Sequence, residues 1–247
     1  MNRKTLGIIG GMGPEATVDL FARIVAATPA KTDQDHLHIL IDNDPSVPDR
    51  TAALLSGGAS PLPHLVRSAQ RLVEAGADLL AMPCNTAHAW HAELSEAVPA
   101  PVLHMLRLSA EAGRARWPRA SAYGLLATAG TVASRLYHHC FAEKGLELVV
   151  PDDDEQRDLV MGAIYGPEGV KGGRRSGPPR ERIELAIQSL LERGAEVIIL
   201  GCTELPLLFP TGACELAPLL NPTEVLAAAC VRLATQAPGP TGRTVHA

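Results

Sequence analysis

Short apolar runs alternate with longer amphipathic stretches along the whole chain. The runs end at Gly, Pro or Asn, whereas the longer stretches are rich in Ala, Leu, Arg and Glu, and the last one predicts a helix over residues 223–235. This alternation is typical of repeated strand–helix units. The apolar runs predict parallel strands, covered on both faces, over residues 6–9, 37–41, 79–82, 102–104, 122–126, 146–150 and 197–200. The expected fold class is therefore α/β.

Two parts of the chain resemble each other. At an offset of 118 positions, residues 74–86 fall on residues 192–204, and both segments have the pattern of a helix end, a glycine turn, a buried strand and a cysteine. At an offset of 117, residues 7–14 fall on residues 124–131. Matches at one nearly constant offset predict a duplicated α/β unit.

The duplication predicts two similar doubly wound lobes whose parallel sheets are related by a pseudo-twofold axis. Residues 1–104 are expected to form the first lobe and residues 105–216 the second, with residues 217–247 packing back on the first. Ligands of open α/β sheets bind beyond the carboxyl ends of the strands. We therefore expect the active site in the cleft between the lobes, where Cys84 and Cys202 would face each other.

Composition narrows the class of protein. The chain has 247 residues, of which 46% are hydrophobic and 20% charged, and its formal net charge of -5 comes from interspersed signs. This composition indicates a globular protein with a sizeable core and gives no reason to expect nucleic acid as a partner. Gly, Pro or charged residues interrupt every apolar run before it reaches the length of a membrane helix, and the first run is too broken for a signal sequence. We expect a cytoplasmic protein with no membrane partner.

The five cysteines fall into two groups. Their number is odd and no CxxC pair occurs, so neither a disulfide framework nor a structural zinc site is expected. A free cysteine is most often a core residue, and we expect this of Cys140, Cys214 and Cys230, which have no counterpart in the other half of the repeat. Cys84 and Cys202 differ from them because they occupy matched positions.

A matched cysteine pair is suited to proton transfer at a carbon atom. Removing the α-proton of an amino acid and returning it from the opposite face requires one acid/base group on each side of a planar, carbanion-like centre. One sulfur must be a thiolate and the other a thiol. Backbone N–H groups and a following helix would lower the thiol pKa at both positions, so Cys84 and Cys202 are the predicted catalytic couple.

Four motifs spread over the chain resemble those of the aspartate/glutamate racemase family, and most closely those of its aspartate racemases. They are Ile-Gly-Gly-Met-Gly-Pro-Glu-Ala-Thr at 9–17, Pro-Asp-Arg-Thr at 48–51, Pro-Cys-Asn-Thr-Ala-His at 83–88 and Gly-Cys-Thr-Glu-Leu at 201–205. The resemblance implies racemisation of aspartate or glutamate by the paired cysteines. It also implies that neither pyridoxal phosphate nor a metal is used, and that the protein is a homodimer.

Candidate substrate-binding residues surround these motifs. Arg50 follows a predicted strand and a loop, a position from which a guanidinium can bind a carboxylate through two hydrogen bonds. The resemblance implies that Arg50 and Lys171 bind the two carboxylates of the substrate and that Met12 lines its pocket. The other candidates follow a cysteine or the second Gly-rich turn, where they could cap a helix or donate to a carboxylate: Asn85, Thr86, Thr128, Thr131 and Thr203.

Other functions fit parts of the sequence. Gly11, Gly13 and Ala16 match a dinucleotide-binding pattern, with Asp42 near the end of the next strand, but that interpretation leaves the cysteine pair unexplained. Related families with this architecture isomerise maleate, racemise hydantoins or decarboxylate arylmalonates, so another cysteine-dependent reaction is an alternative. A dicarboxylate-binding protein without catalysis would need the cationic residues but not both sulfurs.

Two further features have no assigned role in the reaction. His88 and His91 are three positions apart, a spacing that suits metal ligands, but nothing nearby in the sequence supplies a third ligand. We expect His88 to lie behind Cys84 and tune its thiol, and His91 to be a surface or core residue. The segment 172–180 is rich in Gly, Pro and Arg, and is either a lid over an anionic substrate or a solvated loop.

Overall fold

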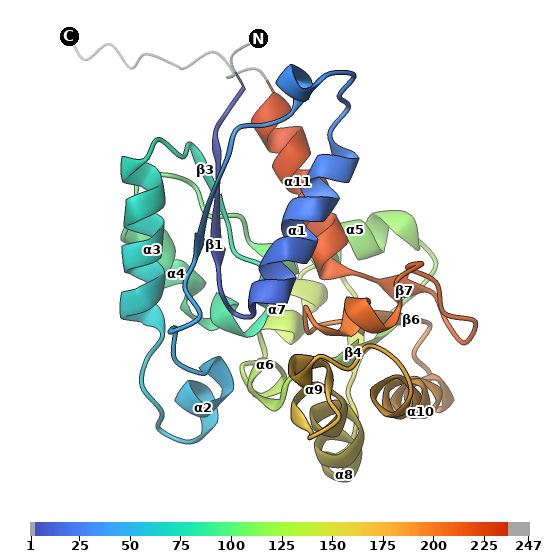
Figure 1. Cartoon of the computed structure of the whole chain (residues 1–247). Coiled ribbons are helices and arrows are strands. Elements are labelled where there is room, and N and C mark those ends of the chain that lie inside the picture. Colours follow the sequence, from blue (N-terminus) through green and yellow to red (C-terminus); the bar gives the residue numbers. More distant parts are fainter. Residues whose placement is uncertain (1–2, 237–247) are drawn as a thin grey trace, which may run out of the picture.

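The computed structural model describes residues 3–236 and contains two parallel β-sheets (Figure 1). The first sheet has the order β2-β1-β3 and consists of β1 (Leu6–Gly10), β2 (Ile39–Asn43) and β3 (Leu79–Ala81). The second has the order β5-β4-β6-β7 and consists of β4 (Ala122–Leu126), β5 (Glu147–Val149), β6 (Val197–Leu200) and β7 (Leu219–Leu220). The predicted α/β class with two parallel sheets is confirmed.

Helices connect the strands and pack around the sheets (Figure 1). In the first half they are α1 (Pro14–Ala27), α2 (Arg50–Leu55), α3 (Leu62–Glu74), α4 (His91–Glu96) and α5 (Met105–Arg116). In the second half they are α6 (Ala129–Ala133), α7 (Leu136–Ala142), α8 (Asp153–Glu155), α9 (Gly162–Tyr165), α10 (Pro178–Glu192) and α11 (Pro222–Thr235). A π-helical turn, Gln156–Met161, joins α8 to α9.

The strand predictions were wrong at the sheet edges. Residues 102–104 do not form a strand, because only Val102 pairs with the sheet, through one bridge to Leu80. The two-residue strand β7 was not predicted, since so short a run gives no pattern. The edge strand β2 is not covered on both faces, as Ile41 is 42% exposed. An edge strand has a neighbour on one side only, so it buries less than the central strands.

The two sheets repeat one packing scheme. A Cβ atom at Gly7 would lie 2.6 Å from Leu80, and one at Gly124 would lie 2.6 Å from Ile198. The repeat in the sequence relates Gly7 to Gly124, and it also relates Leu80 to Ile198. Val102 pairs with Leu80 as β7 pairs with β6, so each sheet ends in a short fourth element. The duplicated sequence thus folds into two sheets with the same strand order.

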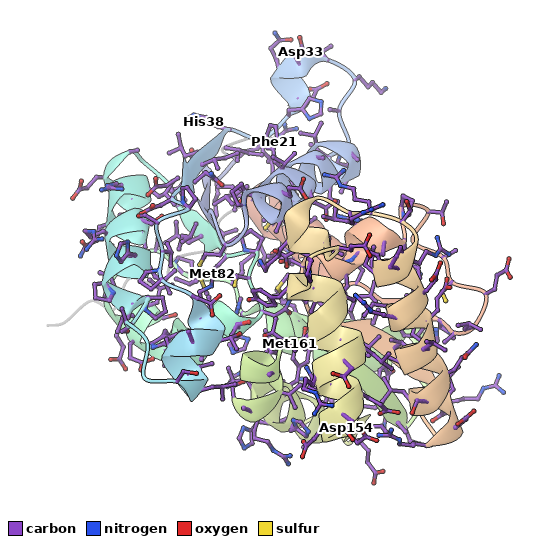
Figure 2. All side chains as sticks on the ribbon, turned by 60° about the horizontal axis from the view of Figure 1, so that its bottom comes forward. Phe21, Asp33, His38, Met82, Asp154 and Met161 are labelled. Carbon is purple, nitrogen blue, oxygen red and sulfur yellow. The ribbon has the colours of Figure 1, made fainter. Side chains whose placement is uncertain are left out.

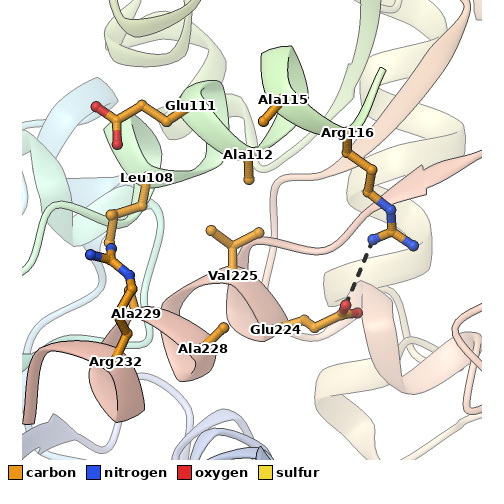
Figure 3. Close-up of a pocket in the computed structure, with 10 residues that line it drawn as sticks. All are labelled: Leu108, Glu111, Ala112, Ala115, Arg116, Glu224, Val225, Ala228, Ala229 and Arg232. Atoms are coloured by element: carbon orange, nitrogen blue, oxygen red, sulfur yellow. Dashed lines mark ion pairs between the residues drawn. The ribbon is translucent and has the colours of Figure 1, made fainter. Parts of the chain in front are cut away.

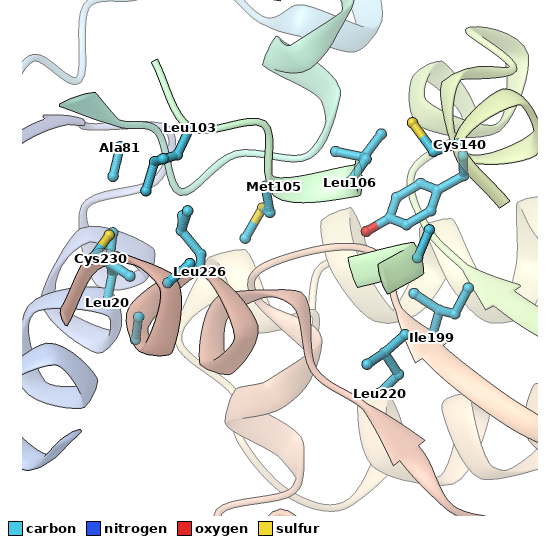
Figure 4. Close-up of a cluster of buried hydrophobic side chains, with 14 of the residues drawn as sticks. Leu20, Ala81, Leu103, Met105, Leu106, Cys140, Ile199, Leu220, Leu226 and Cys230 are labelled. Atoms are coloured by element: carbon cyan, nitrogen blue, oxygen red, sulfur yellow. The ribbon is translucent and has the colours of Figure 1, made fainter. Parts of the chain in front are cut away.

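Helices α5 and α11 occupy equivalent places after these fourth elements and link the two halves. Helix α11 packs on α1 and α5, and α5 packs on α7. Figure 4 shows the apolar core that runs between them without interruption, from Leu20 on α1 past Leu226 on α11 to Ile199 on β6. The lobe boundaries predicted from the sequence stay a prediction, and residues 237–247 of the predicted carboxy-terminal segment lie outside the described residues.

None of the helices in residues 3–236 combines the length and apolar character needed to cross a membrane.

Candidate active site

A narrow cavity lies at the carboxyl ends of the four central strands. Met12 follows β1, Cys84 follows β3, Thr128 follows β4 and Cys202 follows β6, so each sheet contributes two strand ends. This is the edge of an open α/β sheet at which ligands bind. The lining contains nine of the ten predicted site residues and two that were not predicted: Met12, Arg50, Cys84, Asn85, Thr86, Thr128, Lys171, Cys202 and Thr203, with Tyr165 and Glu204.

The cavity is too narrow for an amino acid as it stands. The space between its side chains is about 270 Å³, but it is so constricted that it has room for about one water molecule. An amino acid can enter only if lining side chains move apart. A wider surface groove runs between α5 and α11, floored by alanine and aliphatic side chains and bounded by the Arg116–Glu224 ion pair (Figure 3). Neither sulfur of the predicted couple lines that groove.

The Gly-rich turn brings Met12 to the cavity. Gly11 has a φ of 94°, and a Cβ atom there would lie 2.2 Å from the carbonyl oxygen of Asp44. Only glycine fits this left-handed backbone and its close approach to the next loop. The space next to the Gly11 Cα atom is thus filled by the backbone of Asp44 and not left open for a dinucleotide.

Arg50 is held by backbone carbonyl groups. It is the first residue of α2, whose N-cap is Asp49. Its guanidinium donates to the carbonyl oxygens of Val47, Pro48 and Met12 at 3.2, 3.1 and 3.4 Å. Its Nε is buried without a hydrogen-bond partner in the part of the chain that the structure describes. The guanidinium is therefore fixed at the cavity wall, and its Nε–H group has no partner among residues 3–236.

Asn85 also has a free donor. Its Oδ1 accepts a hydrogen bond from the Tyr137 hydroxyl at 2.6 Å, whereas its buried Nδ2 has no partner among residues 3–236. A buried donor without a partner costs stability, so this amide is suited to a ligand carboxylate. The sequence suggested that the Asn85 side chain could cap a helix, but it makes no capping hydrogen bond.

Three hydroxyl groups join the two halves of the site. The Thr86 hydroxyl lies 3.0 Å from that of Thr128 and 2.8 Å from that of Thr131. Thr131 does not line the cavity but lies behind Thr128, whose hydroxyl caps α6. These side chains connect the loop after β3 to the loop after β4, so Thr131 supports the site rather than forming its wall.

Short 3₁₀ helices follow both cysteines. They are Thr86–Trp90 after Cys84 and Leu205–Leu208 after Cys202. The sequence predicted a helix after each cysteine, whose dipole would lower the thiol pKa at both positions. A single 3₁₀ turn aligns few peptide dipoles, so charged side chains dominate the electrostatics instead.

The charge next to Cys202 is negative. The thiol of Cys202 donates to Oε2 of Glu204 at 3.0 Å, and the Lys171 ammonium donates to Oε1 of the same carboxylate at 2.6 Å. Burial and the Glu204 charge raise the pKa of the Cys202 thiol well above its usual value. The predicted lowering of the thiol pKa is therefore wrong for Cys202.

Lys171 and Glu204 form a partly buried ion pair in the cavity wall. Burial raises the pKa of Glu204, but Lys171 and Cys202 more than offset this and keep its carboxylate ionised. Burial likewise opposes the positive charge of Lys171, and Glu204 outweighs it, so the pKa of the ammonium is raised. Lys171, which was expected to bind a substrate carboxylate, binds a carboxylate of the protein in this structure.

Tyr165 was missed because no motif surrounds it. It ends α9, its hydroxyl donates to Oδ2 of Asp49 at 3.3 Å, and its ring lies 5.4 Å from the Lys171 ammonium. Burial raises the pKa of its hydroxyl to about 12. Tyr165 therefore closes the cavity by connecting the second half of the chain to the first. Glu204, by contrast, lies within a motif that the sequence singled out, directly beside Thr203.

His88 lies behind Cys84, as expected. Its Nε2 accepts from the Met105 amide at 3.1 Å, so its Nδ1 carries the proton and donates to the Cys84 carbonyl oxygen at 2.8 Å. The rings of His91 and His104 lie 5.6 and 5.2 Å from it. Burial lowers the pKa of His88 to about 4, so a neutral imidazole holds the Cys84 backbone. No group of three or more His, Cys, Asp or Glu side chains within residues 3–236 is arranged to hold a metal ion.

The basic segment 172–180 is not part of the cavity wall. Its arginines form ion pairs with carboxylates at the surface. One of these pairs, between Arg175 and Glu15 at 2.7 Å, joins the segment to α1 in the other half. The segment therefore contributes a contact across the cleft but no side chain to the cavity.

Comparisons with known proteins extend over both halves of the chain. A family model described as Asp/Glu/Hydantoin racemase matches residues 9–230. The chain is 25% identical over 213 residues to a protein of Bacillus subtilis (strain 168), the "Broad specificity amino-acid racemase RacX", and this match covers 81% of this chain and 85% of that protein.

Solved structures are similar over nearly their full length. The aspartate racemase of Picrophilus torridus is 31% identical, with a TM-score of 0.79 and coverage of 94% of each chain. An aspartate racemase homologue from Pyrococcus horikoshii OT3 is 26% identical, with a TM-score of 0.73, and the match covers 94% of this chain and all of that one. The range matched by the family model, residues 9–230, includes Cys84 and Cys202.

Proposed function

Since this chain belongs to the Asp/Glu/Hydantoin racemase family, as its motifs predict, we propose that it racemises a small acidic amino acid, aspartate or glutamate. The α-proton moves between Cys84 and Cys202, with no cofactor and no metal. One observation carries the proposal: both sulfurs, each 5% exposed, line one narrow cavity at the carboxyl ends of two equivalent strands.

In this mechanism the thiolate of one cysteine removes the α-proton and the thiol of the other delivers a proton to the opposite face. Donors fixed at the cavity wall hold the α-carboxylate as charge develops on the α-carbon. Arg50 and the free Nδ2 of Asn85 are in position to do so. The substrate's own ammonium group adds to the stabilisation of the carbanion-like state.

The second carboxylate of an acidic substrate requires a second cation. Lys171 is that cation, and it has to share its ammonium between Glu204 and the substrate, because Glu204 already lies 2.6 Å away. Aspartate is the first candidate because the similar Picrophilus structure is an aspartate racemase. The similar Bacillus protein has broad specificity by name, so other amino acids belong in the same test.

The test is deuterium incorporation in D₂O without added pyridoxal phosphate. The protein should exchange the α-proton of both enantiomers of its substrate and convert each into a racemic mixture. Cys84→Ala and Cys202→Ala should each abolish racemisation, and Cys140→Ala should not. Full racemase activity in either catalytic-site variant would refute the two-base mechanism. Turnover of maleate, hydantoins or arylmalonates instead of amino acids would replace it with another reaction of the family.

We also propose a homodimer. Helix α1 presents three exposed apolar side chains on one stripe, Val18, Phe21 and Val25; Phe21 is labelled on this helix in Figure 2. A stripe of this kind is typical of an interaction surface. Light scattering after size-exclusion chromatography should give the mass of two chains, and Phe21→Lys should give the mass of one. A monomeric wild-type protein at micromolar concentration would contradict the proposal.

A further inference from the structure

The two sulfurs of the cavity are equally buried but have different charged neighbours. Cys84 and Cys202 are each 5% exposed, so a small reagent meets similar steric obstruction at both. The Cys202 thiol is 3.0 Å from the Glu204 carboxylate. A carboxylate at this distance accepts a proton-bearing S–H group as a donor and repels a thiolate. The geometry around Cys202 therefore favours the protonated sulfur.

Glu204 is locked in this role by Lys171. The ammonium lies 2.6 Å from Oε1, while Oε2 receives the Cys202 thiol and, at 3.3 Å, the Thr203 hydroxyl. The carboxylate is only 5% exposed, so water does not compete for these contacts. Because Lys171 keeps Glu204 ionised, Glu204 acts as an acceptor for the thiol and not as a donor to it.

Cys84 has the opposite surroundings. Arg50 and Cys84 line the same narrow cavity, and the buried guanidinium is the cation on that side of it. Burial lowers the pKa of the guanidinium, but the charges of Cys84 and Asp49 more than offset the burial and raise it. The guanidinium cannot turn away, because carbonyl groups on two loops hold it. A fixed cation beside a sulfur favours the thiolate.

We infer that Cys84 carries the thiolate and Cys202 the thiol when the site is empty, and that Glu204 is the positioning residue that sets this distribution. The inference has a consequence for catalysis, and this consequence rests on the proposed function: the two enantiomers of the substrate are not handled alike. The substrate enantiomer whose α-hydrogen faces Cys84 is processed at once. The other enantiomer requires the proton to move from Cys202 to Cys84 before catalysis.

The proton balance of one turnover agrees with a Cys84 thiolate and a Cys202 thiol in the empty site. In the first turnover the α-carbon–hydrogen bond breaks, Cys84 becomes a thiol, and the proton of Cys202 is transferred to the α-carbon from the other side. The product then leaves a Cys202 thiolate beside the ionised Glu204. Two negative charges so close together repel each other, so Cys202 takes a proton from water and Cys84 releases one, which restores the starting state.

The test measures the reactivity of each sulfur without any substrate. The wild-type protein is treated with iodoacetamide over a range of pH and digested, and the peptides containing Cys84 and Cys202 are quantified by mass spectrometry. The thiolate is the reactive form. At neutral pH Cys84 should therefore be labelled at least about tenfold faster than Cys202, the ratio that corresponds to one pKa unit, and its labelling should begin at lower pH. Cys214, which is partly exposed, serves as the internal reference for the reagent.

Glu204→Gln tests the cause. This variant keeps the shape of the side chain but removes the charge, so labelling of Cys202 should rise about tenfold and its pH profile should move down. Glu111→Gln is the matched control, because it also removes a carboxylate paired with a lysine, Lys144 at 3.3 Å, and Glu111 lines the surface groove and not the cavity. It should leave both profiles unchanged.

Two outcomes overturn the inference. One is wild-type labelling that is equal at the two sulfurs or faster at Cys202, a result that does not depend on whether any variant folds. The other is a folded Glu204→Gln protein whose Cys202 profile is unchanged. Because labelling needs no turnover, a protein that labels as expected but racemises no amino acid would refute the proposed function and leave this inference standing.

Discussion

Cys84 and Cys202 are supported by similar backbone and by different side chains. Each follows a buried central strand and precedes a 3₁₀ turn. Yet the charged group next to Cys84 is a guanidinium, and the one next to Cys202 is a carboxylate. A duplicated scaffold is enough to put two sulfurs in the wall of one cavity. A two-base reaction also needs one of them charged and the other neutral, and only unequal side chains provide that.

The difference extends behind the sulfurs. The imidazole of His88 holds the Cys84 carbonyl, whereas the repeat places Pro206 at the corresponding position after Cys202. His104 caps α5 by accepting from the Arg107 amide, and the corresponding Asn221 caps α11. The histidines behind Cys84 therefore have no histidine at the corresponding positions 206 and 221 of the second half.

The largest expected effect comes from removing one of the two sulfurs at a time. In Cys202→Ala and Cys84→Ala, racemisation should fall by at least about 10³-fold, since each variant loses one acid/base group. Each should still exchange the α-proton of one enantiomer with D₂O, and the two variants should act on opposite enantiomers. Exchange of the same enantiomer by both would show that the sulfurs do not face opposite sides of the substrate.

Arg50→Met should have the next largest effect. It removes the proposed charge-assisted contact with a substrate carboxylate, worth about 1.5–3 kcal/mol, so kcat/KM should fall about 10–10²-fold. Arg50→Lys should recover only part of this, because an ammonium cannot form the same paired contact. Steady-state kinetics with both enantiomers provide the measurement. A loss of less than tenfold in Arg50→Met would remove Arg50 from substrate binding.

The histidine behind Cys84 should make stability depend on pH. Burial lowers the pKa of His88 from 6.5 to about 4, so between these values the unfolded chain binds a proton that the folded chain does not. The free energy of unfolding should therefore decrease as the pH falls from about 6.5 to about 4, by up to about 3 kcal/mol from this group. Urea unfolding across that range should show a shallower decrease for His88→Gln than for the wild type. Equal slopes would contradict the assignment.

Substitution of the matched glycines Gly7 and Gly124 tests whether the two sheets are packed in the same way. Gly7→Ala and Gly124→Ala each place a Cβ atom 2.6 Å from a buried side chain of the neighbouring strand. Overpacking of this kind costs about 1–3 kcal/mol. Thermal and urea unfolding should show similar destabilisation for the two variants. A loss in one and none in the other would mean that the two sheets are packed differently.

The local sequence pattern was sufficient to predict the parts of the site that occur in both halves of the repeat. The buried runs before Cys84 and Cys202 predicted their strands, and the shared offset predicted that the two sulfurs would lie at equivalent strand ends. The motifs also led to Arg50, which lines the same cavity. These residues were accessible because periodicity and motif spacing are properties of short segments.

Contacts between distant segments were not accessible. Lys171 and Glu204 are 33 positions apart, and their contact depends on how the 3₁₀ turn Val170–Gly172 packs against the loop after β6. Tyr165 reaches Asp49 over 116 positions. The charge next to each sulfur arises from such contacts, so the unequal charged surroundings of two matched cysteines could not be read from their matched sequences.

The smallest expected effect lies at the surface contact across the cleft. Arg175 and Glu15 are 2.7 Å apart but 55% and 48% exposed, and an exposed ion pair contributes about 0–1 kcal/mol. Arg175→Ala should therefore change the free energy of unfolding by about 0.5 kcal/mol or less and leave kcat/KM almost unchanged. The buried contact between Thr86 and Thr131 and the hydrogen bond from Tyr165 to Asp49 already join the two halves, so the arginine is not needed to close the site. A tenfold change in kcat/KM would instead show that the basic segment acts as a lid and that its charge assists an anionic substrate.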